Sequence, residues 1–218
     1  MLTEITTGLL ALVGFTFIDR ILTAAGAASP YYAVHAAHNA YIVYSTMGDL
    51  YTTFTDFHHL DQYPANTKAA LVVTALHMYH YLVYRHKFQL DDWLHHGLMI
   101  GVAIPIGLWV SRSPLLGFSL FFSTGLPGGI DYLLLFLQRN GFIGRLTEKG
   151  VNRWLNVWIR APGCVGHAAL TAAYVCSSQT GSWITLIPAF LMYWNGQYFL
   201  ERVVADHAVQ SARPAIQP

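Results

Sequence analysis

Charged side chains are scarce in this sequence. Its 218 residues include 12 Lys and Arg and 11 Asp and Glu, so 11% are charged, against roughly a quarter in a soluble domain. A soluble globule of this size could not cover its surface with so few charges and remain dispersed. The hydrophobic content of 54% excludes a disordered chain. The composition therefore predicts a polytopic membrane protein.

Other absences exclude further classes. The two cysteines, Cys164 and Cys176, are twelve residues apart on one predicted helix, too far to pair with each other, so a disulfide scaffold is excluded. A net charge of +1 gives no basic field for nucleic acid, which is not expected as a partner. The sequence also lacks a serine hydrolase elbow and a phosphate-binding loop.

Seven apolar segments are each near the ~20 residues that a helix needs to cross a bilayer. They are residues 5–24, 31–54, 67–85, 93–111, 114–137, 154–177 and 182–204. No segment alternates long enough for a membrane strand, and the short connections force neighbouring helices to pack antiparallel. We expect an all-α membrane helical bundle of about seven transmembrane helices. Residues 1–30 would hold the first helix, 31–205 the rest of the bundle and 206–218 a disordered tail.

Two of these segments have a second interpretation. Residues 31–54 carry His35, His38, Asn39 and Asp49, which are costly in lipid, so this helix is either internal to the bundle or interfacial. We favour the internal helix, because removing it leaves the neighbouring loops too long. Residues 5–24 are also compatible with a cleaved signal peptide, but the basic start expected of one is missing.

Lysine and arginine are distributed unevenly between the two ends of these helices. Ten lie on the side opposite the amino terminus: Arg20, Arg85, Lys87, Arg139, Arg145, Lys149, Arg153, Arg160, Arg202 and Arg213. Two, Lys68 and Arg112, lie on the amino-terminal side. The positive-inside rule makes the richer side cytosolic. The amino terminus is then lumenal or exterior, and the carboxyl terminus cytosolic.

Ionisable residues inside predicted membrane helices are functional candidates, because burying them in lipid costs free energy. At ~1.5 Å per residue, most of them converge on one layer near the basic side. The members of this layer are His35, His38, His77, His80, His95, His96, Asp131, Arg160 and Glu201. Asp49 and His167 lie deeper or toward the other side. Such a layer predicts a pocket that admits a charged head group from the cytosol while apolar tails extend into the bundle.

The spacing of the histidines refines this prediction. His77 and His80 are three residues apart and share a helix face, as do His35 and His38. His95 and His96 are adjacent and ~100° apart, so at most one points squarely into the pocket. Any single histidine is more often structural, bonded to a carbonyl or hydroxyl. For the pair His95 and His96 we favour function.

Several short motifs carry a family resemblance. The run Leu90-Asp91-Asp92-Trp93-Leu94-His95-His96 resembles the paired-histidine segment of TLC-domain proteins, the membrane family that includes ceramide synthases. Residues 41–50 are similar to a tyrosine-rich span ending in an aspartate, and residues 123–127 to the family's Ser-Thr-x-x-Pro element. Residues 152–160 and 192–195 resemble the last two spans. The similarity covers about residues 40–205, and its weight comes from the order of the motifs.

The resemblance has limits that decide what it implies. Ceramide synthases carry a His-Asp-x-x-Ser-Asp type stretch on the following span, whereas this chain has one aspartate, Asp131, and no histidine there. It therefore resembles the shorter TLC-domain proteins, several of which are linked to membrane lipid composition without a settled reaction. The paired histidines transfer to His95 and His96. The resemblance implies an intracellular membrane, the endoplasmic reticulum or another organelle.

Three functions remain open. The first is lipid binding or acyl transfer, in which His95 or His96 is the general base and Asp131 or Asp92 orients it. His35, His38, His77, His80, Arg160 and Asp49 would then bind substrate, with acyl-CoA as co-substrate and no bound cofactor. The second is a non-catalytic subunit of a membrane complex; a homo-oligomer also stays open. The third is a di-iron lipid oxygenase, which we disfavour because the histidine spacing does not match its motifs, so no metal is expected.

Overall fold

The computed structural model describes residues 2–111 and 113–212. Every regular element within these ranges is helical, which confirms the predicted all-α fold. The longer helices join into seven rods, which are α1 (Leu2–Ala24); α2 (Pro30–Thr55); α3 (Thr67–Tyr84); α4, η3 and α5 (Leu90–Leu98, Met99–Ala103, Ile104–Trp109); α6, η4 and α7 (Leu115–Leu120, Phe121–Gly125, Leu126–Arg139); α8, η5 and α9 (Arg145–Leu155, Asn156–Arg160, Ala161–Ser177); and α10 (Leu186–Ala212). Short turns η1 (Phe57–Gln62), η2 (Arg85–Lys87) and η6 (Trp183–Thr185) lie in the connections.

The rods follow the seven predicted segments, but not all of them meet a membrane criterion. Within the described ranges, Ile5–Ala24 and Leu115–Arg139 are long and apolar enough to cross a membrane. These two helices give weak support to a membrane location. The number of crossings beyond two remains a prediction.

The predicted disordered tail is wrong for residues 206–212. They continue α10, where Gln210 donates to Asp206 at 3.1 Å. Asp206 also pairs with Lys149 of α8, whose ammonium nitrogen lies 2.9 Å from its carboxylate. This ion pair holds the last turns of α10 against another rod. Residues 213–218 lie outside the described residues, as do two of the counted cations, Arg112 and Arg213.

The first three rods pack around an apolar core. Its fully or nearly fully buried members include Phe15, Val34, Ile42, Val73, Leu76 and Tyr79. A buried carboxylate crosses this core: Oδ1 of Asp19 accepts hydrogen bonds from the hydroxyls of Tyr79, at 2.8 Å, and Tyr84, at 2.6 Å. These two bonds fasten α1 to α3.

Helix α2 fits the internal interpretation of residues 31–54 on one face only. One face, including His35, Asn39, Ile42 and Thr46, is buried against α1, α3, α6 and α7. The opposite face exposes aromatic side chains such as Tyr44. The helix is therefore half internal and half on the outer surface.

Three rods contain a five-residue π-helical segment, and each segment ends two residues before a proline. The pairs of segment end and proline are Ala103 and Pro105, Gly125 and Pro127, and Arg160 and Pro162. Proline cannot donate a backbone hydrogen bond, and its ring crowds the carbonyl four residues earlier. A turn widened to i→i+5 bonding relieves that crowding without ending the helix.

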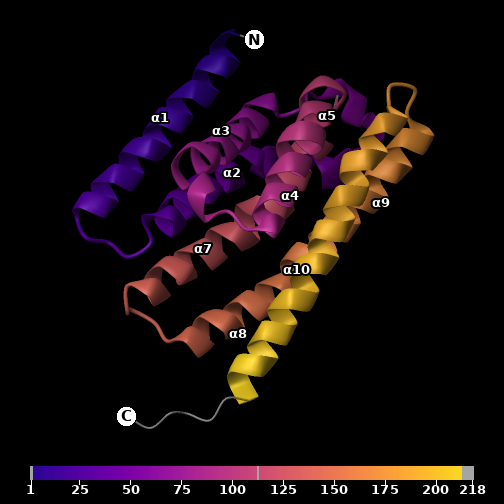
Figure 1. The fold of residues 1–218 in the computed structure, drawn as a ribbon. Helices are drawn as coiled ribbons and strands as arrows, with labels where there is room; N and C mark the ends of the chain where they lie inside the picture. Colours follow the sequence, from indigo (N-terminus) through magenta and orange to yellow (C-terminus); the bar gives the residue numbers. More distant parts are fainter. Residues whose placement is uncertain (1, 112, 213–218) are drawn as a thin grey trace.

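Figure 1 shows how the rods are arranged. Helices α9 and α10 run side by side along one edge of the bundle, and α1 lies at the opposite edge. The start of α1 and the end of α10 lie at opposite ends of the molecule (Figure 1). At the basic end, Asn140 joins two loops, accepting from the Ala28 amide at 2.9 Å and donating to the Ala28 carbonyl at 3.1 Å.

Candidate functional site: a histidine-lined cavity

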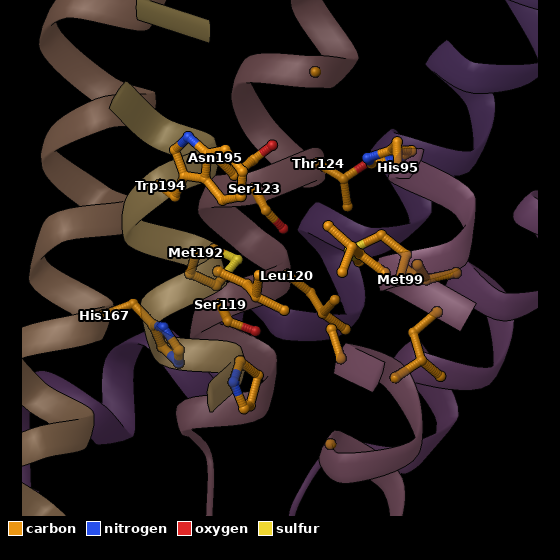
Figure 2. Close-up of a pocket in the computed structure, with 18 of the residues that line it drawn as sticks. His95, Met99, Ser119, Leu120, Ser123, Thr124, His167, Met192, Trp194 and Asn195 are labelled. Atoms are coloured by element: carbon orange, nitrogen blue, oxygen red, sulfur yellow. The ribbon is translucent and has the colours of Figure 1, made fainter. Parts of the chain in front are cut away.

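A cavity of about 590 Å³ lies between the rods. This volume falls within the range of small-molecule sites. All rods except α1 contribute to its lining, and all three π-helical segments do. Met99, Leu120 and Met192 supply apolar wall near its middle (Figure 2).

Five of the six predicted pocket histidines line this cavity at its basic end. They form the histidine cluster, His35, His77, His80, His95 and His96. The rings are close: His35 stacks on His80 with 4.3 Å between centroids, and His77 lies 5.5 Å from His95. Three rods, beginning with α2, α3 and α4, thus bring together residues as distant in sequence as His35 and His96.

Three cluster members have the same backbone anchor. Nδ1 of His35, His77 and His96 lies 2.7–2.8 Å from the carbonyl oxygen four residues earlier. A carbonyl only accepts, so Nδ1 of each ring carries the proton. A neutral ring then keeps its lone pair on Nε2. The helical i, i−4 geometry therefore fixes the tautomer.

His96 and His80 form a chain of hydrogen bonds. Nε2 of His96 lies 3.3 Å from Nδ1 of His80, and since this Nε2 is the acceptor, His80 donates through Nδ1–H. Both ring nitrogens of His96 are therefore engaged, and its side chain is buried. Nε2 of His80 is left as a buried acceptor with no partner among the described residues.

His95 differs from its neighbour. Its side chain is exposed, whereas His96 is only 8% exposed. No hydrogen bond involves its ring within the described ranges. Figure 2 shows the His95 imidazole near Thr124, across the cavity from His167. Because His95 is the accessible member of the pair, it is the stronger candidate for contact with a reacting group.

Asp131 and Arg160 also line the basic end of the cavity. Oδ1 of Asp131 and Nε of Arg160 are buried without a hydrogen-bond partner in the part of the chain that is described. The guanidinium stacks on Phe199 of α10, with 4.4 Å from its central carbon to the ring centroid. Both atoms have almost no accessible surface, so they lie behind the cavity wall. The carboxyl and guanidinium groups of these two residues nevertheless make this end of the cavity polar.

His38 and Asp49 lie outside the cavity, which corrects the predicted pocket. His38 is buried against Phe15 of α1 with 5.7 Å between rings, and its Nδ1 lies 2.7 Å from the side-chain oxygen of Asn39. His38 comes three residues after His35, so its side chain is rotated by about 60° around the helix axis. This rotation is enough for His38 to face another rod. Asp49 instead accepts from Asn66 at 2.8 Å and joins α2 to the start of α3.

Several cavity residues were not predicted. Tyr31 and Tyr132 cover His35, each with a ring centroid 4.1 Å from the imidazole. Asn152 and Asn156 line the cavity on the same helix face as Arg160, because the three residues are spaced four apart. This i, i+4 repeat was a readable signal in the sequence. The two tyrosines had none, because only the packing of α2 against α7 brings them together.

No three His, Cys, Asp or Glu side chains in the described ranges are placed to hold a metal ion. Comparisons with protein-family models, with curated proteins and with solved structures give no match. The resemblance to TLC-domain proteins therefore depends on the sequence motifs alone.

Proposed function

We propose that this chain is a membrane protein that binds a lipid with an acyl chain, with the lipid's polar head in the histidine cluster. The observation that carries the proposal is the cavity itself. Its basic end gathers five imidazoles, Asp131 and Arg160, and its walls beyond that end include Met99, Leu120 and Met192. An amphiphile matches this division into a polar end and an apolar wall.

The outer surface supports a membrane location. Large apolar side chains are exposed on most rods, such as Leu10 at 68%, Tyr44 at 82%, Trp109 at 77% and Phe190 at 63%. An outer surface with so many exposed large apolar side chains fits contact with lipid better than contact with water. The proposal therefore includes seven crossings, of which α1 and the α6–α7 rod meet the hydropathy criterion.

Orientation and location are part of the same proposal. The ten-to-two excess of cations makes the end of the histidine cluster cytosolic, with the amino terminus lumenal and the carboxyl terminus cytosolic. The TLC resemblance adds an intracellular membrane, the endoplasmic reticulum or another organelle. Protease protection of a carboxyl-terminal tag in sealed vesicles would contradict this orientation.

Acyl transfer is the second candidate, and the accessibility of His95 favours it. A neutral imidazole facing a cavity can take a proton from an amine or hydroxyl, and Arg160 can hold an anionic group beside it. Acyl-CoA is the expected acyl donor. If the chain is an enzyme, His95→Ala should lower transfer by about 10²–10⁴-fold, the usual contribution of a general base.

Lipid mass spectrometry of the purified protein tests the binding proposal. We expect a copurifying acyl lipid in the wild type and much less in Ala103→Phe, which places a ring in the cavity wall. Ala169→Phe is the matched control, because Ala169 is exposed on α9 and does not line the cavity. Equal lipid in all three proteins would refute the proposal. Absence of lipid together with copurifying proteins would favour a subunit of a membrane complex.

A further inference from the structure

The cavity reaches the outer surface between α4 and α10. Its mouth is marked by residues that line the cavity and are also exposed. They are Gln89, Asp91, Asp92, Leu94 and His95 on one side, Trp194 and Arg202 of α10 on the other, and Thr180 in the loop before α10. The lining residues of α2, α3 and the α6–α7 rod are buried or half-buried. The cavity therefore opens along the edge where α4 faces α10.

Helix α4 is a weakly packed wall of this cavity. His96 is its only buried residue. Within the described ranges its backbone has little close packing against any other rod, whereas α3 packs against α1, α2, α5 and α6. The turn η2 precedes α4 and the π-helical segment η3 follows it. Both are places where the backbone can bend, so α4 can move as one piece.

A single carboxylate joins α4 to α10 across the mouth. Oδ2 of Asp91 lies 2.9 Å from a guanidinium nitrogen of Arg202 and accepts a hydrogen bond from the Tyr198 hydroxyl at 3.1 Å. The guanidinium lies over the Tyr198 ring, 4.5 Å from its centroid, so these two α10 side chains hold each other in place. The side chains of Asp91 and Arg202 are 58% and 59% exposed, and an exposed ion pair is weak. The contact can therefore favour a closed mouth and still break readily.

From this arrangement we propose that α4 is the gate through which the lipid enters the cavity, and that Asp91 latches it to α10. This inference rests on the proposed function, because it takes a lipid to be the molecule that enters. The opposite edge of α4 is tied to α3 by the bond between His96 and His80, so the edge facing α10 is the one that opens (Figure 1). The mouth lies beside the histidine cluster, and exposed Leu94 and Trp194 give the acyl chain an apolar path.

Rates of lipid exchange test the latch. A fluorescent fatty acid would be mixed with the detergent-purified wild type, Asp91→Asn and Arg202→Gln, and its uptake and release followed by stopped flow. Each variant should exchange the fatty acid about 2- to 5-fold faster, the range for losing an exposed ion pair. The Kd should stay close to the wild-type value, because the latch is closed in both the empty and the occupied protein and its loss speeds uptake and release equally.

The variants carry their own checks. Both side chains are exposed, so each variant should fold as the wild type does and keep its Tm. The double variant should exchange the fatty acid no faster than the faster single variant, because all three lack the same contact. Rates that multiply in the double variant would show that the two residues act separately and would contradict the latch.

Cross-linking tests the movement of α4 itself. In a Cys176→Ser background, Asp91→Cys with Arg202→Cys would be joined by a short bis-methanethiosulfonate, which a reducing agent removes. We expect the cross-link to abolish uptake and release, and reduction of the same sample to restore both. Lys149→Cys with Asp206→Cys is the matched control, because this ion pair also spans 2.9 Å and joins α8 to α10, but neither residue lines the cavity. The control cross-link should leave exchange unchanged.

The possible outcomes separate the gate from the proposed function. If the wild type binds the fatty acid but the cross-link between positions 91 and 202 leaves its exchange rates unchanged, the lipid enters elsewhere and the inference is wrong. If Asp91→Asn and Arg202→Gln weaken binding without speeding exchange, these side chains are ligands of the lipid and not a latch, which also refutes the inference. If no fatty acid binds the wild type, lipid binding itself fails and the inference with it.

Discussion

His95 and His96 are adjacent in sequence, yet the structure gives them different environments, and substituting each by alanine should separate stability from function. His96 is buried, donates to the Asp92 carbonyl and accepts from His80. His95 is exposed at the cavity and has no hydrogen bond within the described ranges. His96→Ala should therefore destabilise the protein, and His95→Ala should leave its stability nearly unchanged.

The expected loss of stability in His96→Ala follows from the hydrogen bonds that this variant loses. Without His96, Nδ1–H of His80 loses its acceptor in a buried position, and an unpaired buried group costs about 1–3 kcal/mol. Measured hydrogen bonds between membrane helices are weaker, about 0.6 kcal/mol on average, so the lower half of this range is the safer expectation. For a chain of this size, 1–3 kcal/mol lowers the Tm by roughly 2–12 °C. His95→Ala should stay within about 0.5 kcal/mol of the wild type.

Thermal unfolding in detergent, followed by the fluorescence of a thiol-reactive dye or by circular dichroism, measures both variants. His96→Gln is the control for packing, because its amide supplies one donor and one acceptor in place of the two ring nitrogens and should recover much of the Tm. Lipid content or acyl transfer is then measured on each folded variant. We expect the larger functional loss in His95→Ala. Equal Tm losses in the two alanine variants, or none in His96→Ala, would refute the hydrogen-bonded chain of His96 and His80.

Three other predictions concern residues away from the cluster. Tyr79→Phe and Tyr84→Phe should each lower the free energy of unfolding by about 1–2 kcal/mol. The double variant should lower it by more than the sum of the two, because Asp19 then loses both donors. A urea or SDS titration of the double variant and both single variants tests this. Asn140→Ala should speed amide hydrogen exchange at Ala28 with little change in Tm. Unchanged exchange would show that the two hydrogen bonds between Asn140 and the Ala28 backbone do not hold this loop in place. In the exposed loop after α2, hydrogen bonding to Asp56 raises the pKa of His59 above 6.5, and His59 lowers the pKa of Asp56 below 3.8. The stability from this pair should therefore be lost as the pH rises through the folded pKa of His59 or falls through that of Asp56. Titration of His59 by NMR should move to lower pH in Asp56→Asn and much less in Asp61→Asn.

The apolar runs were enough to locate the helices, because each run is bounded by polar or proline-containing joints. The start of the sixth rod was missed since residues 145–153 are mostly polar, although Glu148 is buried at 1% exposure and Asn152 faces the cavity. Hydropathy averages over the helix surface and cannot detect an amphipathic extension packed on one side. The last turns of α10 were missed for the same reason.

The depth of the histidines along their helices predicted that they lie in one layer. It did not predict which of them line the cavity. Rotation about a helix axis separates His35, in the cavity, from His38, against Phe15. Neither spacing nor hydropathy fixes that rotation, because it depends on which neighbouring rod is nearest. The pair His95 and His96 was expected to send one ring squarely into the pocket. The structure places both on its wall and leaves only His95 accessible.

The π-helical segments decide where the rods tolerate a change of chain length. Each segment bonds i to i+5, so it contains one residue more than an α-helical turn needs. Deleting a single residue from 121–125 would let the rod close into regular α-helix and leave Asp131 and Tyr132 pointing in nearly the same direction, because the widened turn absorbs that residue. Deleting a residue from the regular helix between Leu126 and Ile130 would instead rotate everything after it by about 100°, and both side chains would leave the cavity wall. The rod can therefore lose a residue where it is widened but not where it is regular.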